Sequence, residues 1–132
     1  MAKIAKIICQ ILGVLFFVTG LGAFVFGEDA DWYHNLLHFV TGLIALYFGF
    51  AGSPSAAKGF CLAFGVGYLS FGILGIAMGD PAMNRLWEVG SILRLSLGDH
   101  IFHIVLGTTI LAGGILTRSG GSQLSTKSER VV

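Results

Sequence analysis

Four long stretches of this 132-residue chain contain no charged side chain, and they run over residues 7–27, 39–57, 59–79 and 100–117. Each is about 18 to 21 residues long, the length that an α-helix needs to cross about 30 Å of hydrocarbon. With 55% hydrophobic and only 11% charged residues, the chain cannot cover a soluble domain with charge. We therefore expect an all-α integral membrane protein with four transmembrane helices, in direct contact with a lipid bilayer.

The expected helices cover about residues 4–27, 32–51, 59–79 and 99–117, within one transmembrane domain over residues 1–118. Residues 119–132 are polar and are expected to form a cytoplasmic tail. Basic residues favour the cytoplasmic side of short loops. With the N-terminus inside, the inner face holds six of them and the outer face two: Lys3, Lys6, Lys58, Arg118, Lys127 and Arg130 against Arg85 and Arg94. Both termini are thus predicted to be cytoplasmic.

The segment between the third and fourth expected helices contains both apolar and charged residues. Asp80 followed by Pro81 is typical of a helix start. Leu86, Val89, Leu93 and Leu97 then fall on one side of a helix, with charged residues elsewhere. We expect a short amphipathic segment on the membrane surface, interrupted at Gly90.

The two halves of the chain resemble each other. Residues 8–27 match residues 60–79 at an offset of 52, and residues 34–49 match residues 99–114 at an offset of 65. The identical pairs include Cys9 with Cys61 and His38 with His103. The repeat predicts two tandem helical hairpins related by a pseudo-two-fold axis along the membrane normal.

Glycines recur every seven residues in the first and third expected helices. Such spacing puts them on one stripe, where small residues let neighbouring helices approach closely in lipid. Gly42 and Gly107 lie on the corresponding small-residue faces of the other two helices. The predicted helix-packing positions are Gly13, Gly20, Gly27, Gly65, Gly72, Gly79, Gly42 and Gly107.

Histidines are the most informative polar residues of the apolar segments. His38 and His103 share their helix faces with small residues, so they are expected to point into the bundle. Three interpretations are open. The histidines form hydrogen bonds between helices, they bind haem, a chlorophyll-type pigment or a transition metal, or they form a proton or solute path with acidic residues. In the second case His34 and His100 would be added ligands, with Asp31 or Asp99 behind them.

No reaction can be assigned to the chain. The sequence contains no glycine-rich phosphate loop, no nucleophile–base set and no pair of catalytic carboxylates, so it is not expected to be an enzyme. Cys9 and Cys61 are expected to be small apolar side chains in a reducing compartment. The net charge of +1 gives no reason to expect a nucleic-acid partner.

The pattern Asn35-x-x-His38-x-x-x-Gly42, a glycine-rich third helix and His103-x-x-x-Gly107 resemble a bacterial family of small four-helix membrane proteins, domain of unknown function 4383. The resemblance covers about residues 8–117, although His100 stands where the second copy would have its asparagine. It implies a four-helix bundle in a bacterial cytoplasmic (inner) membrane or an internal membrane continuous with it. It implies no activity, substrate or cofactor.

The small size and the glycine faces favour a non-enzymatic structural or accessory subunit of a membrane complex, bound to other membrane protein subunits. The alternatives are a haem-, pigment- or metal-binding module that uses His38 and His103, or a small transporter or sensor. The sequence does not decide between them.

Overall fold

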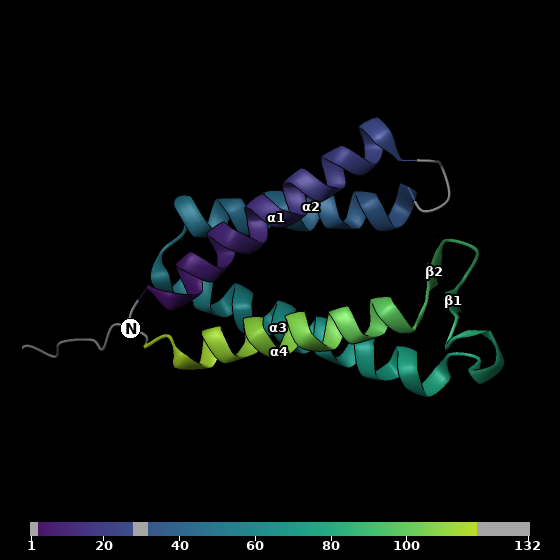
Figure 1. Cartoon of the computed structure of the whole chain (residues 1–132). Helices are drawn as coiled ribbons and strands as arrows, with labels where there is room; N and C mark the ends of the chain where they lie inside the picture. The colour runs from purple at the N-terminus through teal and green to yellow at the C-terminus, as the bar shows by residue number, and fades with distance from the viewer. Residues whose placement is uncertain (1–2, 28–31, 119–132) are drawn as a thin grey trace, which may run out of the picture.

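The computed structural model describes residues 3–27 and 32–118. Within them the chain forms four α-helices: α1 (Ile4–Phe26), α2 (Trp32–Phe50), α3 (Pro54–Met78) and α4 (Leu97–Leu116). Helix α1 packs along α2 and α3 packs along α4, which gives two helical hairpins (Figure 1). The predicted cap at Asp31 and the predicted tail over residues 119–132 lie outside the described residues.

Three of the helices, α1, α3 and α4, are long and apolar enough to cross a membrane. Helix α2 is not among them, because His34, Asn35 and His38 in its first half lower its hydropathy. Large apolar side chains also face outward along the helices, where lipid rather than water suits them. Examples are Ile11, Val18, Val25, Tyr47, Val66, Val105 and Ile115. The structure is therefore that of a mostly helical membrane protein.

Side-chain caps place the starts of α3 and α4 earlier than the sequence predicts. The Ser53 hydroxyl accepts a hydrogen bond from a backbone N–H of the first turn of α3, and Pro54 occupies the first helical position. At α4, one carboxylate oxygen of Asp99 accepts from the Ser96 backbone N–H at 2.8 Å, which completes a capping box.

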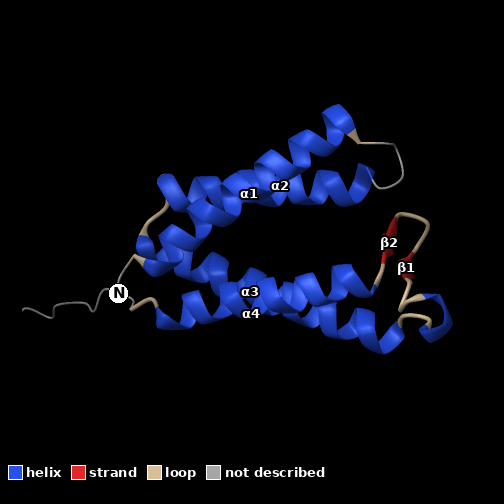
Figure 2. Ribbon diagram, viewed as in Figure 1, coloured by secondary structure: helices blue, strands red, loops and turns tan. Residues whose placement is uncertain are grey.

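The segment between α3 and α4 is a β-hairpin, so the predicted amphipathic segment consists of strands and its expected helical stripe is wrong. Asp80 does cap a short 3-10 turn, η2 (Pro81–Met83). Strands β1 (Trp87–Val89) and β2 (Leu93–Leu95) then pair antiparallel (Figure 2). The predicted interruption at Gly90 is the turn between them, where φ is +61°.

The faces of this β-hairpin explain why it forms. The apolar side chains of its two strands are partly or fully buried, whereas Glu88 and Arg94 are exposed. Alternation with a period of two is the pattern of a half-buried strand. Glu88 and Arg94 lie opposite each other and form a salt bridge of 2.9 Å. The exposed pair contributes at most about 1 kcal/mol, so burial of the apolar face stabilises the β-hairpin.

Arg85 fixes the base of the β-hairpin to both neighbouring helices. Its guanidinium Nη1 donates to the Ile76 carbonyl at 3.2 Å, near the end of α3 where a cation is favoured. Its own carbonyl accepts from Nε2 of His100 on α4 at 2.9 Å. The β-hairpin therefore keeps a fixed position at the end of the second helical hairpin.

Glycines bring the helices of each hairpin into close contact. A Cβ added at Gly13 would lie 2.8 Å from the Leu46 backbone nitrogen, and one at Gly42 would lie 2.6 Å from that of Phe17. In the second hairpin, a Cβ at Gly65 would lie 2.6 Å from the Leu111 nitrogen. The structure places Gly20 against Phe39, Gly72 against His100 and Ile104, and Gly107 against Leu69.

Gly27 and Gly79 have a different position from the other predicted packing glycines. They are the C-caps of α1 and α3, and their N–H groups donate to Ala23 and Gly75 of their own helices. They end helices rather than join them.

The two helical hairpins meet at the end of the molecule that holds the described termini. Ala5, Cys9, Ala57 and Cys61 are fully buried there, and the two sulfur atoms are 3.8 Å apart. The Ala5 backbone N–H also donates to the Thr117 hydroxyl at 2.8 Å. Toward the β-hairpin end the helical hairpins diverge (Figure 1).

We predict that Gly107→Ala destabilises the protein by about 1–3 kcal/mol, because the new methyl group meets the α3 backbone at Leu69. Thermal unfolding in detergent measures the effect. Gly59→Ala, on α3, is the matched control, since a Cβ there has open space within 4 Å. An equal loss in both variants would contradict the contact.

We also predict that the two buried thiols form an intramolecular disulfide when a membrane-permeant copper–phenanthroline oxidant is added. A short movement suffices, because the 3.8 Å separation must close to about 2.05 Å. Intact mass spectrometry should show the reversible loss of two hydrogen atoms, and Cys61→Ser should abolish it. Intermolecular dimers as the sole product would contradict the observed contact between Cys9 and Cys61.

Candidate functional site: a histidine cluster between two cavities

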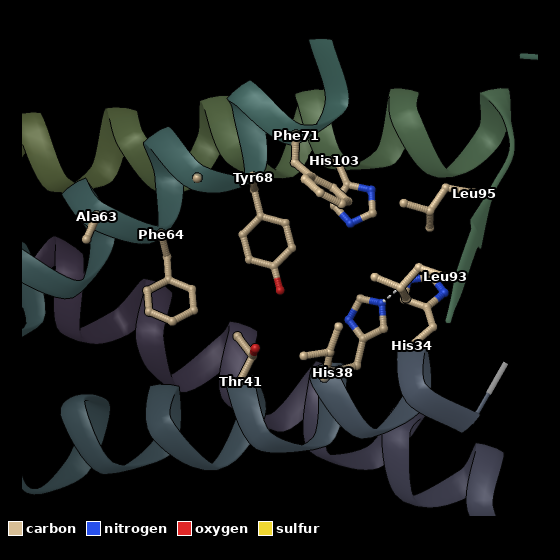
Figure 3. Close-up of a pocket in the computed structure, with 12 residues that line it drawn as sticks. His34, His38, Thr41, Ala63, Phe64, Tyr68, Phe71, Leu93, Leu95 and His103 are labelled. Atoms are coloured by element: carbon tan, nitrogen blue, oxygen red, sulfur yellow. Dashed lines mark hydrogen bonds between the residues drawn. The ribbon is translucent and has the colours of Figure 1, made fainter. Parts of the chain in front are cut away.

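Three histidines from the two helical hairpins meet at the diverging end of the bundle. His34 and His38 lie one turn apart on α2, and their ring centroids are 4.5 Å apart. His103 on α4 lies 6.2 Å from His34 and 6.5 Å from His38, with its ring within about 25° of parallel to both. The cluster therefore joins helices that are far apart in the sequence (Figure 3).

Two cavities of about 360 Å³ each share this cluster as a common wall. The first, the α2–α3 cavity, lies between those helices and reaches β2. It is lined by His34, Leu37, His38, Thr41, Ala63, Phe64, Gly67, Tyr68, Phe71, Leu93, Leu95 and His103. The second, the α1–α4 cavity, is lined by Leu15, Phe16, Thr19, Gly20, His34, Asn35, His38, Asp99, Phe102 and His103.

A direct hydrogen bond joins the two histidines of α2. The Nε2 atoms of His34 and His38 are 2.8 Å apart, so one ring donates and the other accepts through a bare nitrogen. Nδ1 of His38 is buried without a partner in the described residues. A buried bare acceptor costs less than a buried unpaired N–H. We therefore assign His38 as the donor, which makes His34 a neutral acceptor.

His103 is held by its own helix. Its Nδ1 lies 2.6 Å from the backbone carbonyl of Asp99, one turn earlier. A carbonyl oxygen only accepts, so Nδ1 carries the proton, and a neutral ring then has a bare Nε2. The side chain is 5% exposed and projects into the α2–α3 cavity (Figure 3). The site thus contains a fixed hydrogen-bond acceptor.

Aromatic rings hold the histidines in position. Tyr68 stacks on His103 at 5.3 Å with an interplanar angle of 18°, and Phe71 meets the same ring edge-on at 5.8 Å. Phe16 meets His38 edge-on at 4.5 Å. The hydroxyl of Tyr68 points across the α2–α3 cavity toward Thr41 (Figure 3). The cavity therefore has an aromatic wall with hydroxyl groups beside it.

His100, one of the four candidate ligands, lies away from the cluster. It is fully buried between α4 and α3, where its ring faces Gly75 and its Nε2 donates to the Arg85 carbonyl. It lines neither cavity. Its place matches the interpretation in which a histidine ties its helix to a neighbouring segment.

Among residues 3–27 and 32–118, no group of three or more His, Cys, Asp or Glu side chains is arranged to hold a metal ion. Asp99, one of the two carboxylates expected behind the histidine ligands, lines the α1–α4 cavity. The other carboxylate, Asp31, lies outside the described residues. Haem or pigment binding needs only one or two histidines and stays a prediction.

Sequence reasoning missed Tyr68 and the two leucines of β2 that line the α2–α3 cavity. Tyr68 had a detectable signal, since it takes the position of Phe16 at the offset of 52 and adds a hydroxyl. The signal for Leu93 and Leu95 was the alternation around Arg94, which is typical of a strand.

A search of curated proteins and a search of solved structures each found no match to the chain. A scan against protein-family models found one described as "Domain of unknown function (DUF4383)", which matches residues 2–116. The match covers α1 through α4 and includes every residue of the histidine cluster. This chain therefore belongs to the family of domain of unknown function 4383.

Proposed function

We propose that this protein is a non-catalytic membrane module that binds a small lipophilic molecule in the α2–α3 cavity. The observation that supports this most is the histidine cluster, which presents an uncommitted ring nitrogen of His103 at the edge of an aromatic cavity. A volume of about 360 Å³ lies within the usual range of ligand pockets. A few polar groups in a largely apolar wall are typical of such pockets.

The composition of the cavity wall supports a binding role rather than catalysis. The residues around the α2–α3 cavity include no carboxylate, lysine, cysteine or serine. Thr41 and Tyr68 carry hydroxyl groups, but no hydrogen bond joins either of them to a histidine in the described residues, as a site for acyl transfer or hydrolysis would need. The proposal therefore assigns no reaction to the protein.

The accessory-subunit role stays a prediction. It rests on the small size, the absence of catalytic groups and the glycine faces, and an amphipathic segment on the membrane surface and a polar tail would suit docking onto a partner. That segment is a β-hairpin whose Leu93 and Leu95 face the protein's own cavity, and residues 119–132 lie outside the described part. The described side chains thus favour ligand binding over docking.

The proposed function includes a repeated architecture, in which a pseudo-two-fold axis relates the helical hairpins. Reciprocal contacts support it: the Cys9 sulfur lies 4.0 Å from the Ala57 carbonyl oxygen, and the Cys61 sulfur lies 3.8 Å from that of Ala5. Adding 52 to Cys9 gives Cys61, and subtracting 52 from Ala57 gives Ala5, so each contact is the counterpart of the other. The glycine contacts obey the same offsets, since Gly13 on Leu46 becomes Gly65 on Leu111.

The proposed setting is a bacterial cytoplasmic or internal membrane that all four helices cross, with both termini in the cytoplasm. The distribution of basic residues supports this orientation. It puts the cavities and the β-hairpin on the outer half of the membrane, within reach of molecules dissolved in lipid.

A cavity-filling variant tests the binding role. We predict that the protein, extracted in mild detergent, carries a non-covalent lipophilic adduct in native mass spectrometry, and that Gly67→Leu removes it. Gly67 lines the cavity, and a Cβ there meets nothing within 4 Å, so the leucine occupies the ligand's space without disturbing the helix.

Gly59→Leu is the matched control on the same helix, because it has equal room but lies outside both cavities. It should keep the adduct. Absence of any adduct on the unmodified protein, or an adduct that survives in Gly67→Leu, would contradict the binding role.

A further inference from the structure

We propose that the α2–α3 cavity is specific for a lipophilic hydroquinone, a neutral ring with two hydroxyl groups and an apolar tail. This inference rests on the proposed binding function and names its ligand class. It follows from the hydrogen-bond direction at His103, the hydroxyl groups beside the aromatic wall and the charge of the lining residues.

The tautomer of His103 requires a ligand that donates a hydrogen bond. Since Nδ1 donates to the Asp99 carbonyl at 2.6 Å, the neutral ring offers only an acceptor at Nε2. A ligand that satisfies this acceptor must bring an O–H or N–H group. The oxidised quinone has only carbonyl acceptors, so it would place two acceptors against each other, whereas the hydroquinone donates a proton.

Two hydroxyl groups, those of Tyr68 and Thr41, can bond a second polar group of the ligand. Tyr68 and Thr41 line the same cavity, and the Tyr68 hydroxyl points toward Thr41 (Figure 3). A hydroxyl both donates and accepts, so this pair can bond the second ring oxygen of the ligand in either state. The two oxygens of a hydroquinone lie on opposite sides of its ring, which matches polar groups on separate parts of the wall.

Aromatic rings on the cavity wall also favour a planar ligand. Phe64, Tyr68 and His103 line one side, with Tyr68 stacked on His103 and 6.3 Å from Phe64. Planar rings favour offset stacking or edge contacts with such a surface, at about 0.5–1.5 kcal/mol for each pair. A saturated chain or a compact polar headgroup would not use this surface.

The charge of the lining residues and the opening of the cavity toward lipid also favour a neutral ligand with an apolar tail. No Lys, Arg, Asp or Glu lines the α2–α3 cavity, so the phosphate of a phospholipid or the carboxylate of a fatty acid would find no counter-charge. Leu37, which lines the cavity, is 52% exposed, and Ala63 and Gly67 are exposed as well. The cavity thus reaches the lipid-facing surface, where an apolar tail can leave it.

A competition experiment tests the specificity. The purified full-length protein is immobilised in detergent at about pH 8, where an ordinary histidine is neutral. It is then incubated without oxygen in an equimolar mixture of a decyl-substituted benzohydroquinone and its matched benzoquinone. The bound molecules are extracted and separated by chromatography. We expect the hydroquinone to be enriched at least about tenfold, as sites that bond a ligand hydroxyl reject analogues without it.

Variants connect the preference to named atoms. His103→Phe keeps an aromatic ring on Tyr68 but lacks the acceptor, so the enrichment should fall to about onefold. Tyr68→Phe should weaken binding of both forms and leave the enrichment unchanged. Tyr47→Phe, which removes a hydroxyl from the exposed face of α2, is the control and should change neither quantity.

Equal binding of the two forms, or an enrichment that persists in His103→Phe, would overturn the hydroquinone assignment. If both forms bind equally and Gly67→Leu abolishes both, the cavity binds the ring without a preference for its reduced form, and the proposed function stands. If neither form binds while the native adduct is present and lost in Gly67→Leu, the ligand class alone is wrong.

Discussion

Close backbone contact at glycine is the constraint on which the rest of this structure depends. Lipid tails are as apolar as the helices, so burial of apolar surface does not drive helices together in a membrane, and close packing must do so. Gly13 and Gly42 provide this contact within the first helical hairpin, and Gly65 and Gly107 provide it within the second. Each hairpin is therefore a tightly packed unit on its own.

Contacts between the two hairpins have a different character. They concentrate at one end, where Ala5, Cys9 and Cys61 are fully buried and Thr117 accepts a hydrogen bond from α1. At the other end, histidine and aromatic side chains stand between the helices. Because the rigid hairpins are joined at one end, they part at the other, and the cavities beside the histidines are a consequence of where the small residues lie.

The sequence was sufficient for the number of helices and, for α1, α3 and α4, for their match to a membrane, and the glycine spacing put small residues on the contacting faces. It was insufficient where local patterns competed. The Trp87–Leu95 segment fits a helical stripe as well as a strand, and only burial against the bundle selects the strand. Likewise His100 and His103 are three residues apart, yet one packs on Gly75 and the other enters the cavity. Sequence spacing cannot separate those two environments.

The two cavities also differ in chemistry, and the proposed repeat explains how. At the offset of 52 Phe16 becomes Tyr68, and at the offset of 65 Thr41 becomes Leu106 and His34 becomes Asp99. Both cavities share His38 and His103, but the α2–α3 cavity gains the two hydroxyl groups and the α1–α4 cavity gains the Asp99 side chain. A perfect duplication would give two equal sites. Divergence at these few positions instead leaves one neutral cavity with a fixed acceptor, which is what selects a neutral hydroxyl-bearing ligand.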